Sequence, residues 1–371
     1  MIINVKNTST RVVKSIRLSP TKGYDMFKKA AVFGDLHLGK HGDSPTFNND
    51  CLDYLEWFCI TAANHNVDRI IFLGDYFDNR SRIRLDTQDY GNRGMDMLRE
   101  VAPVDVIVGN HDMFHKHSRD VHSVSCYKEW DHVTVYDTIT EASNVGYVPY
   151  LVGTEYLDVL NLDVKYIFGH LELPGFLMNS SVEFPNRGQF NANGFKHPDM
   201  VFSGHFHKRQ YKASKSGVPV WYIGSPFGHD FNDVDDPERG MMILEWGNDP
   251  LFIDYEDGPL FQRFKVSEIL DMLDDGSMTS KTRPTSILEI RDNVGIPLTE
   301  LADLRDMVAE FVREVRMKET KTVVDVTESD VTDMDSKSVT DIVVEHLENI
   351  QNRGDEIDPS KLTKIFLGDD Q

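Results

Sequence analysis

The sequence predicts a layered α/β fold, and two observations lead to that prediction. Between about residues 28 and 255, short apolar runs recur, and each stops abruptly at a cluster of polar residues. The runs are four or five residues long and rich in β-branched and aromatic side chains, which favours buried strands. Between the first two runs, Phe47–His65 carries apolar residues at a helical period along one face. Strands that alternate with helices define an α/β domain.

The expected elements of this domain follow in chain order. Residues 1–24 alternate apolar and polar side chains around a Ser/Thr turn, which predicts a short edge hairpin before the main fold. Leu85–Val101 is a second candidate helix, after Phe47–His65. The five predicted strands are Ala30–Phe33, Arg69–Leu73, Val104–Val108, Lys165–Phe168 and Met200–Ser203.

The pattern changes after Asp257-Gly258-Pro259. Phe264–Leu273 and Leu298–Val315 show helical periods, and Ser286–Arg291 between them is a predicted strand, so we expect a small α/β cap. A Thr/Asp/Val-rich linker follows, and then two short helices. The apolar stripe of the first predicts docking on a partner, with a solvated acidic terminus as the alternative. The expected division is an N-terminal extension at 1–27, a main domain at 28–257, the cap at 258–320, the linker at 321–337 and the helical tail at 338–371.

Composition narrows the class of protein. The 371 residues include 39 Lys and Arg against 61 Asp and Glu, a formal net charge of −22. This argues against a free-standing protein that binds nucleic acid by bulk positive charge, although local patches and metal ions can reverse the sign at a site. Three cysteines without C-x-x-C spacing predict reduced thiols. With no signal pattern and no membrane-length apolar run, we expect a soluble cytoplasmic protein without membrane contact.

Every predicted strand ends in residues that bind metal ions. Since the carboxyl ends of strands in an α/β sheet converge on one crevice, we expect these side chains to meet. Carboxylate, amide and imidazole without thiolate suit Mn²⁺, Fe²⁺ or Zn²⁺. Seven ligands exceed one tetrahedral site and fit two ions about 3.5–4 Å apart that share a carboxylate. The clusters are Gly34-Asp35-Leu36-His37, Gly74-Asp75-Tyr76-Phe77-Asp78, Gly109-Asn110-His111-Asp112, Gly169-His170 and Gly204-His205-Phe206-His207.

Other charged and titratable residues carry weaker signals. Four histidines lie outside these clusters, and we expect them to be exposed or on the substrate side: His41, His115, His117 and His229. Basic residues gather directly after the clusters, which predicts a rim that follows phosphates, with an ordinary solvated surface as the alternative. They are Arg80, Arg82, Arg84, Lys116, Arg119, Lys208, Arg209, Lys212 and Lys215.

The motifs GDLHLG, GDYFD, VGNHD, GH and GHFH, in that order, resemble the calcineurin-like metallophosphoesterase superfamily. IVGNHD, FGHLELPGF, SGHFH, and YIGSPF followed by DDPERGMMILE resemble more narrowly the SbcD-type nuclease subunit of recombination and repair complexes, and most nearly the recombination endonuclease subunit of tailed bacteriophages. The resemblance covers about residues 28–255. It implies a central β-sandwich flanked by helices, with two divalent ions, Mn²⁺ first and Mg²⁺, Fe²⁺ or Zn²⁺ also open.

The resemblance also assigns roles to residues of this chain. His111 is the implied general acid for the leaving 3′ oxygen, a role that suits an imidazole. Asp78 stands where cellular relatives often have histidine, and we expect its carboxylate to pair with His111 and orient the ring. The implied metal ligands are Asp35, His37 and His207 for one ion, Asn110, His170 and His205 for the other, and Asp75 as the bridge.

The implied function is a Mn²⁺-dependent DNA exonuclease or endonuclease acting in recombination, repair or replication. The implied partners are DNA, an SMC-like ATPase of the SbcC type on which the tail docks, and a second copy joined through Phe47–His65 or Leu85–Val101. For a phage protein the location is the host cytoplasm. Two alternatives stay open: a phosphatase or small phosphodiesterase with the same centre, and an inactive scaffold. Serine/threonine phosphatases typically have Arg and Glu where this chain has Asn79 and Asp112.

Overall fold

The computed structural model describes residues 26–178, 182–186, 190–234, 236–291 and 296–318. These belong to one unit, Met1–Glu319, and Thr320–Gln371 forms a second unit. The predicted hairpin at 1–24, the linker at 321–337 and the tail helices at 338–371 lie outside the described residues. Over the described part of the chain, no helix is both long enough and apolar enough for a membrane span.

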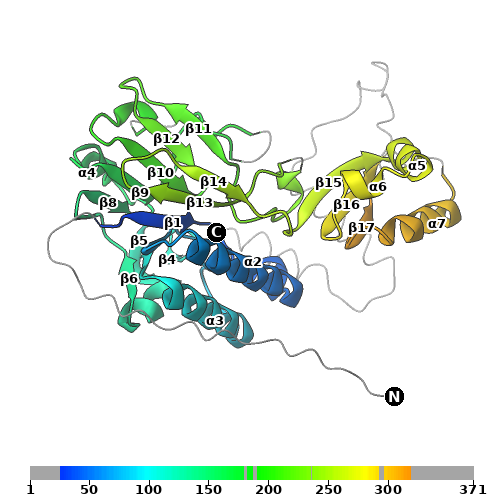
Figure 1. Ribbon diagram of the computed structural model, residues 1–371, viewed down its shortest axis with the longest axis horizontal. Helices are drawn as coiled ribbons and strands as arrows, with labels where there is room; N and C mark the ends of the chain where they lie inside the picture. The colour runs from blue at the N-terminus through cyan, green and yellow to red at the C-terminus, as the bar shows by residue number, and fades with distance from the viewer. Residues whose placement is uncertain (1–25, 179–181, 187–189, 235, 292–295, 319–371) are drawn as a thin grey trace, which may run out of the picture. The chain divides into compact units, whose positions relative to one another are not determined.

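Two six-stranded sheets form the main domain (Figure 1). The first has the order β14 (Leu251–Asp254), β13 (Gly240–Glu245), β1 (Lys29–Phe33), β2 (Arg69–Phe72), β3 (Val104–Ile107) and β6 (Val133–Tyr136). The second has the order β11 (Gln210–Ala213), β12 (Pro219–Tyr222), β10 (Met200–Gly204), β9 (Tyr166–His170), β8 (Val145–Val148) and β7 (Thr140–Ala142). In each sheet four neighbouring strands are parallel. Antiparallel pairs complete both edges of the second sheet and the β13–β14 side of the first. All five predicted strands are confirmed.

Alternation along the strands divides the core between the two faces of the first sheet. On β1, Ala30 and Val32 join Phe168 and Phe202 of the second sheet in one buried cluster. The intervening Ala31 and Phe33 face the helical layer and join a second cluster with the side chains of the two long helices. Since successive side chains of a strand point to opposite faces, one strand thus seals both layers of the fold.

The helices α2 (Pro45–Asn64) and α3 (Leu85–Val101) pack on the outer face of the first sheet (Figure 1). Both confirm the predicted helices, and α2 begins two residues early because Ser44 caps it and Pro45 suits its first turn. The shorter elements are α1 (Lys40–Asp43), α4 (Tyr156–Leu160), the 3₁₀ turns η1 (Ser123–Glu129), η2 (Ala192–Gly194) and η3 (Phe231–Asp233), and the hairpin β4 (Met113–His115) and β5 (Ser118–His122).

The cap region has its own parallel three-stranded sheet and its own buried cluster. Its elements are β15 (Leu260–Lys265), α5 (Val266–Asp274), α6 (Met278–Lys281), β16 (Ser286–Arg291), α7 (Leu298–Ala309) and β17 (Glu314–Met317). The strand at 286–291 is confirmed. The helix predicted over 298–315 is wrong beyond Ala309, since residues 314–317 pair with β16. The helix predicted from Phe264 starts only at Val266, because Phe264 belongs to β15.

Candidate metal centre

The metal-binding candidates lie on loops that follow strands of both sheets. Three of these loops follow β1, β2 and β3 of the first sheet. In the second sheet, His170 is the last residue of β9, and His205 and His207 follow β10. The expectation of one shared sheet edge is therefore corrected: the ends of two facing sheets supply the centre. Backbone hydrogen bonds from Asp35 N to Gly74 O (2.9 Å) and from His37 N to Asp75 O (3.0 Å) fasten the first two loops together.

The backbone of the loops is under strain where the candidates stand. Asp35, His37, Asp75 and His205 all have positive φ, between 54° and 89°. Residues other than glycine rarely adopt this conformation. Close approach also explains a glycine in the second cluster: a Cβ on Gly74 would lie 2.6 Å from Nδ1 of His170. Strain of this kind gathers at functional sites, where the surrounding fold maintains it.

The first group of ligands surrounds His37. Ligand atoms of Asp35, His37 and Asp75 lie within 4.8 Å of one another, and those of His37 and His207 fall within the same limit in a second group. The Nε2 atom of His37 lies 3.6 Å from Oδ2 of Asp75. Asp35, His37 and Asp75 are at most 2% exposed. The structure thus brings together the four residues predicted for one ion and its bridge.

The second group meets at the side-chain oxygen of Asn110. Nε2 of His170 and Nδ1 of His205 each lie 2.8 Å from this Oδ1 atom, and Nε2 of His170 lies 3.4 Å from Oδ2 of Asp75. Nδ1 of His170 donates to the carbonyl of Leu73 at 2.7 Å, which directs Nε2 into the cluster. Asp75 therefore touches both groups, as a bridging carboxylate must.

Burial and charge pairing set the protonation of this centre without metal. Burial alone would lower the pKa of His170, but the Asp75 carboxylate outweighs it and raises that pKa to about 9. Burial would raise the pKa of Asp75, but His170 holds it well below its usual range. Burial raises the pKa of Asp35 to about 7. A metal ion must therefore displace protons here, so its affinity is expected to fall as the pH falls.

His111 lies beside the metal-binding cluster, with its ring centroid 4.7 Å from that of His37. Its Nδ1 donates to the backbone carbonyl of Asp78 at 2.6 Å, which leaves Nε2 as the nitrogen that exchanges a proton. The predicted pairing of the Asp78 carboxylate with His111 is wrong, because Oδ1 of Asp78 lies 3.2 Å from Nδ1 of His37. A carboxylate in that position orients a metal-binding imidazole.

The buried Asp112 carboxylate binds backbone N–H groups of the loops that follow β2 and β3. Its Oδ2 accepts the N–H groups of Asp75 and Gly109, both at 2.9 Å. Its Oδ1 accepts the N–H of Tyr76 at 3.1 Å and the hydroxyl of Ser123 at 2.9 Å. Burial, followed by the Asp75 charge, raises the pKa of Asp112 to about 6, so the group is ionised at neutral pH. The carboxylate thereby fixes the position of the bridging residue.

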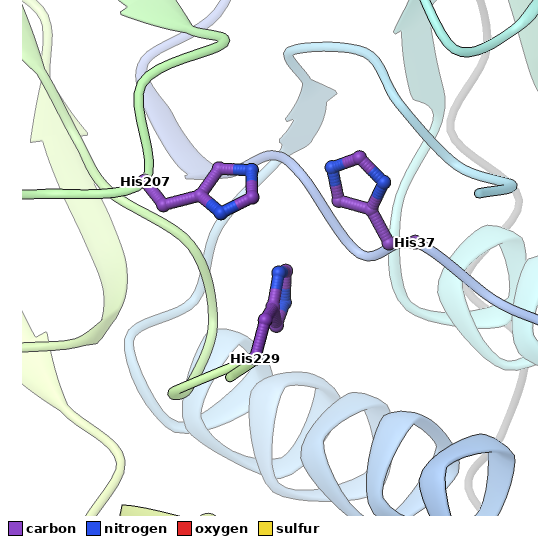
Figure 2. Close-up of side chains that lie close together, drawn as sticks. All are labelled: His37, His207 and His229. Atoms are coloured by element: carbon purple, nitrogen blue, oxygen red, sulfur yellow. The ribbon is translucent and has the colours of Figure 1, made fainter. Parts of the chain in front are cut away.

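His229 is a further candidate ligand that the sequence pattern left outside the predicted clusters. It was predicted to be exposed or on the substrate side, and it is fully buried beside His37 and His207 (Figure 2). Its ring centroid lies 5.3 Å from that of His37 and 4.7 Å from that of His207. The available signal was the triplet Gly228-His229-Asp230, which repeats the order of glycine then ligand seen in the other clusters. His41, His115 and His117 are exposed, as expected.

Two members of the predicted basic rim have structural roles instead. Arg119 forms a two-armed ion pair with Glu155 at 2.7 and 2.6 Å and donates to two backbone carbonyls. Arg209 pairs with Asp254 at 2.7 Å and stacks on the ring of Phe252. These two guanidinium groups are therefore engaged within the protein, whereas the prediction had them binding phosphates. Exposed members such as Arg82 and Lys116 keep the predicted role as an expectation.

The residues present fit a pair of divalent ions. Carboxylates, one amide oxygen and several imidazoles are the donors that borderline ions accept. Burial lowers the pKa of His37, so this ring is available as a neutral ligand. Nδ1 of His37 faces the Asp78 carboxylate at 3.2 Å, whereas its Nε2 is buried without a hydrogen-bond partner in the described part of the chain. Such an unsatisfied group is rare in folded proteins, and a bound ion would satisfy it.

Residues 28–209, about half of the chain, match the family model of calcineurin-like phosphoesterases. With the two-sheet architecture and the cluster of His and Asp, this match supports the calcineurin-like metallophosphoesterase superfamily and its mixed α/β fold for this chain. The superfamily implies an enzyme that hydrolyses phosphoesters at a dinuclear metal centre.

Three viral proteins are similar to the chain in sequence. Protein 244L of Invertebrate iridescent virus 6, named as a phosphoesterase, is 26% identical over 244 residues, 62% of this chain and 80% of that protein. Protein 078R of Invertebrate iridescent virus 3, named likewise, is 27% identical over 50% of this chain and 55% of that protein. Exonuclease subunit 1 of Enterobacteria phage T4 is 25% identical over 57% of this chain and 63% of that protein. The chain therefore spans less than two thirds of the last two relatives.

Two solved structures illustrate the similarity in three dimensions. A dimetal phosphatase from Danio rerio gives a TM-score of 0.36 at 14% identity, covering 61% of this chain and 98% of that one. The nuclease MPE from Pseudomonas putida gives a TM-score of 0.29 at 17% identity, covering 58% of this chain and 82% of that one. Likeness at this level carries no argument about the substrate.

Proposed function

We propose that this chain is a Mn²⁺-dependent DNA nuclease, the catalytic subunit of an SbcCD-type recombination and repair complex. The observation that carries the proposal is the joint presence of a complete dinuclear ligand set and His111 beside it. The similarity to a phage protein named exonuclease subunit 1 supports DNA as the substrate class. The motifs FGHLELPGF and YIGSPF support the same family.

The proposed chemistry divides the roles among residues of this chain. Asp75 contacts both ligand groups, and Asp112 holds its backbone in place. Two bound divalent ions would supply Lewis-acid activation of the phosphodiester. His111 donates a proton from Nε2 to the leaving 3′ oxygen, while the carbonyl of Asp78 keeps its Nδ1 proton fixed. Water attacks phosphorus and the P–O3′ bond breaks, which leaves a 5′ phosphate and a 3′ hydroxyl.

The proposed partners follow from charge and from the relatives. A net charge of −22 leaves little bulk attraction for DNA, so an SMC-like ATPase of the SbcC type would supply much of the DNA contact. The phage relative is itself named a subunit, which supports an assembly of this kind. A homodimer through α2 or α3, and docking of the tail at 338–371 on the ATPase, belong to the same proposal. Exposed basic residues such as Arg82 and Lys116 would guide phosphates toward the centre.

A phosphatase with the same centre is the second candidate. The two iridescent virus relatives are named as phosphoesterases without reference to DNA, which favours this alternative as strongly as the phage relative favours a nuclease. Against protein phosphatases of the serine/threonine type stand Asn79 and Asp112. Asp112 here serves as a buried anchor for backbone N–H groups. An inactive scaffold is less consistent with the complete ligand set.

The decisive experiment compares two substrates with one protein preparation. The purified chain would be incubated with Mn²⁺ and end-labelled linear duplex DNA, and in parallel with a phosphoserine peptide. Both reactions would be run with and without the proposed ATPase of the SbcC type. Asp75→Asn, which keeps the side-chain shape, is the matched inactive control, and His117→Ala is the control for an exposed histidine. Cleavage of DNA that Asp75→Asn abolishes supports the proposal. Dephosphorylation of the peptide without DNA cleavage contradicts it.

A further inference from the structure

His229 is a buried histidine with no structural partner for its ring. It lies on the loop after β12, is 0% exposed, and neither of its ring nitrogens has a hydrogen-bond partner among the described residues. A buried polar atom without a hydrogen-bond partner destabilises the folded state. If the residue served only to fill the core, phenylalanine would occupy the same space without leaving buried ring nitrogens unsatisfied. The unsatisfied ring nitrogens therefore indicate that this imidazole binds a ligand.

The surroundings leave one direction for that ligand. The rings of Phe47 and Phe227 pack against His229 at centroid distances of 5.5 and 5.6 Å and offer it no polar atom. His37 and His207 lie beside it, and one ring nitrogen from each of the three histidines lies within 4.8 Å of the others. Figure 2 shows the three rings around a common space, supplied by three separate segments of the chain. Three imidazoles that converge without donating to one another form a nitrogen-rich cation site.

A buried ion pair fixes His229 in this position. The N–H of His229 donates to Oδ2 of Asp233 at 2.8 Å, and the other oxygen of Asp233 lies 3.0 Å from Nη2 of Arg239. Nη1 of Arg239 donates to the carbonyl of His207 at 3.0 Å. Arg239 is 3% exposed, so these contacts are shielded from water. The same guanidinium thus positions the His207 loop and the His229 loop.

His41 holds the loop from the opposite side. Its Nε2 donates to the backbone carbonyl of His229 at 2.8 Å. With the N–H and the C=O of His229 both engaged, the peptide groups of the loop cannot turn toward the centre. The imidazole is the only part of the residue left to meet a ligand.

We propose that His229 is an additional metal ligand, which joins Asp35, His37 and His207 at one of the two sites. Three imidazoles on one side of the centre, against two in the Asn110 group, make the two sites chemically unequal. Imidazole favours later first-row ions over Mn²⁺ and Mg²⁺, so the site with His229 binds Fe²⁺, Co²⁺ or Zn²⁺ in preference. The proposal rests on the dinuclear centre and is independent of whether DNA is the substrate.

The test uses Co²⁺ as the probe, since its visible absorption reports ligand type and number. Full-length wild type, His229→Ala and His229→Phe would be stripped of metal and titrated with Co²⁺, following absorption and heat. Phenylalanine preserves the packing between Phe47 and Phe227 while it removes both nitrogens. His197→Ala, at an exposed histidine, is the control. Thermal unfolding of each metal-free variant verifies that it is folded.

The expected result is a loss of Co²⁺ affinity at one of two sites by roughly 10–100-fold in both variants, with weaker, shifted visible bands. The preference for Zn²⁺ over Mn²⁺ at that site should fall as well. Wild-type affinity and spectrum in a folded His229→Phe protein would overturn the proposal. A lower affinity with an unchanged spectrum would also overturn it, because His229 would then act only on the position of its neighbours. Failure of the proposed nuclease activity would leave the Co²⁺ results unaffected.

Discussion

Replacing Asp112 by asparagine tests whether one buried carboxylate holds the bridging loop. The change keeps the size of the side chain and turns one of its two oxygens into an NH₂ donor. If that donor takes the Oδ2 position, it faces the N–H groups of Asp75 and Gly109, each now 2.9 Å from an acceptor. If it takes the Oδ1 position, it faces the N–H of Tyr76. Either orientation leaves at least one buried N–H without an acceptor.

The expected cost follows from these contacts. A hydrogen bond to a charged acceptor contributes about 1.5–3 kcal/mol, and an unsatisfied buried donor costs about 1–3 kcal/mol. Because burial also penalises the ionised carboxylate at this pH, which offsets part of the loss, the free energy of unfolding of Asp112→Asn should be roughly 1–3 kcal/mol lower than that of the wild type. Urea denaturation at pH 7.5 without metal measures it, with the exposed Asp120→Asn as the matched control. A difference below about 0.5 kcal/mol, the level of ordinary surface changes, would refute the anchoring role.

Four further outcomes are expected. Asp75→Ala should remove both ions and all hydrolysis, and metal analysis that finds two ions per folded chain would exclude the bridging role. His111→Ala should keep the ions and lose roughly 10²–10⁴-fold in rate, and a DNA substrate with 3′-bridging sulfur, whose leaving group needs no proton, should regain much of it. Arg119→Ala should lower the free energy of unfolding by about 1–3 kcal/mol through loss of the Glu155 pair, without a specific effect on DNA affinity. Burial raises the pKa of Asp105 from 3.8 to about 6, so its stabilising contribution is complete below pH 3.8 and is lost as the pH rises through about 6. The stability of wild type relative to Asp105→Asn should thus fall by about 3 kcal/mol between about pH 4 and about pH 7, and a difference independent of pH would contradict this shift.

Local patterns in the sequence were sufficient for five strands and the two long helices of the main domain, but not for the remaining strands of its two sheets. The five apolar runs and the two helices at Phe47–His65 and Leu85–Val101 were predicted because their residues are buried on a regular period. The metal-binding clusters were predictable because each one follows directly on a strand. Periodicity did not separate α7 from β17, since Val312 and Val315 continue an apolar pattern that pairing with β16 overrides.

Contacts between distant segments set the limit of prediction within the site. His229 lies beside His37 on a loop held by the Arg239 ion pair, and the order of glycine then ligand at Gly228-His229 is a weak signal because it does not follow directly on a strand. Arg119 follows a metal-binding cluster in sequence, yet Glu155 takes up its charge 36 residues further along the chain. The Asp78 carboxylate contacts His37 instead of His111. Both imidazoles lie nearby, and the spacing of the residues in the sequence does not determine which of them the carboxylate contacts.

Because the metal-binding loops are strained, the supply of divalent metal is expected to affect the stability of this protein as well as its activity. Left-handed backbone at Asp35, His37 and Asp75, together with buried carboxylates, weakens the folded state until bound cations compensate. Ligands that bind only the folded form stabilise it by mass action. A shortage of the ion would therefore enlarge the unfolded fraction that cellular proteases remove. The abundance of the protein, and with it the capacity of any complex it joins, would then follow the concentration of free divalent metal.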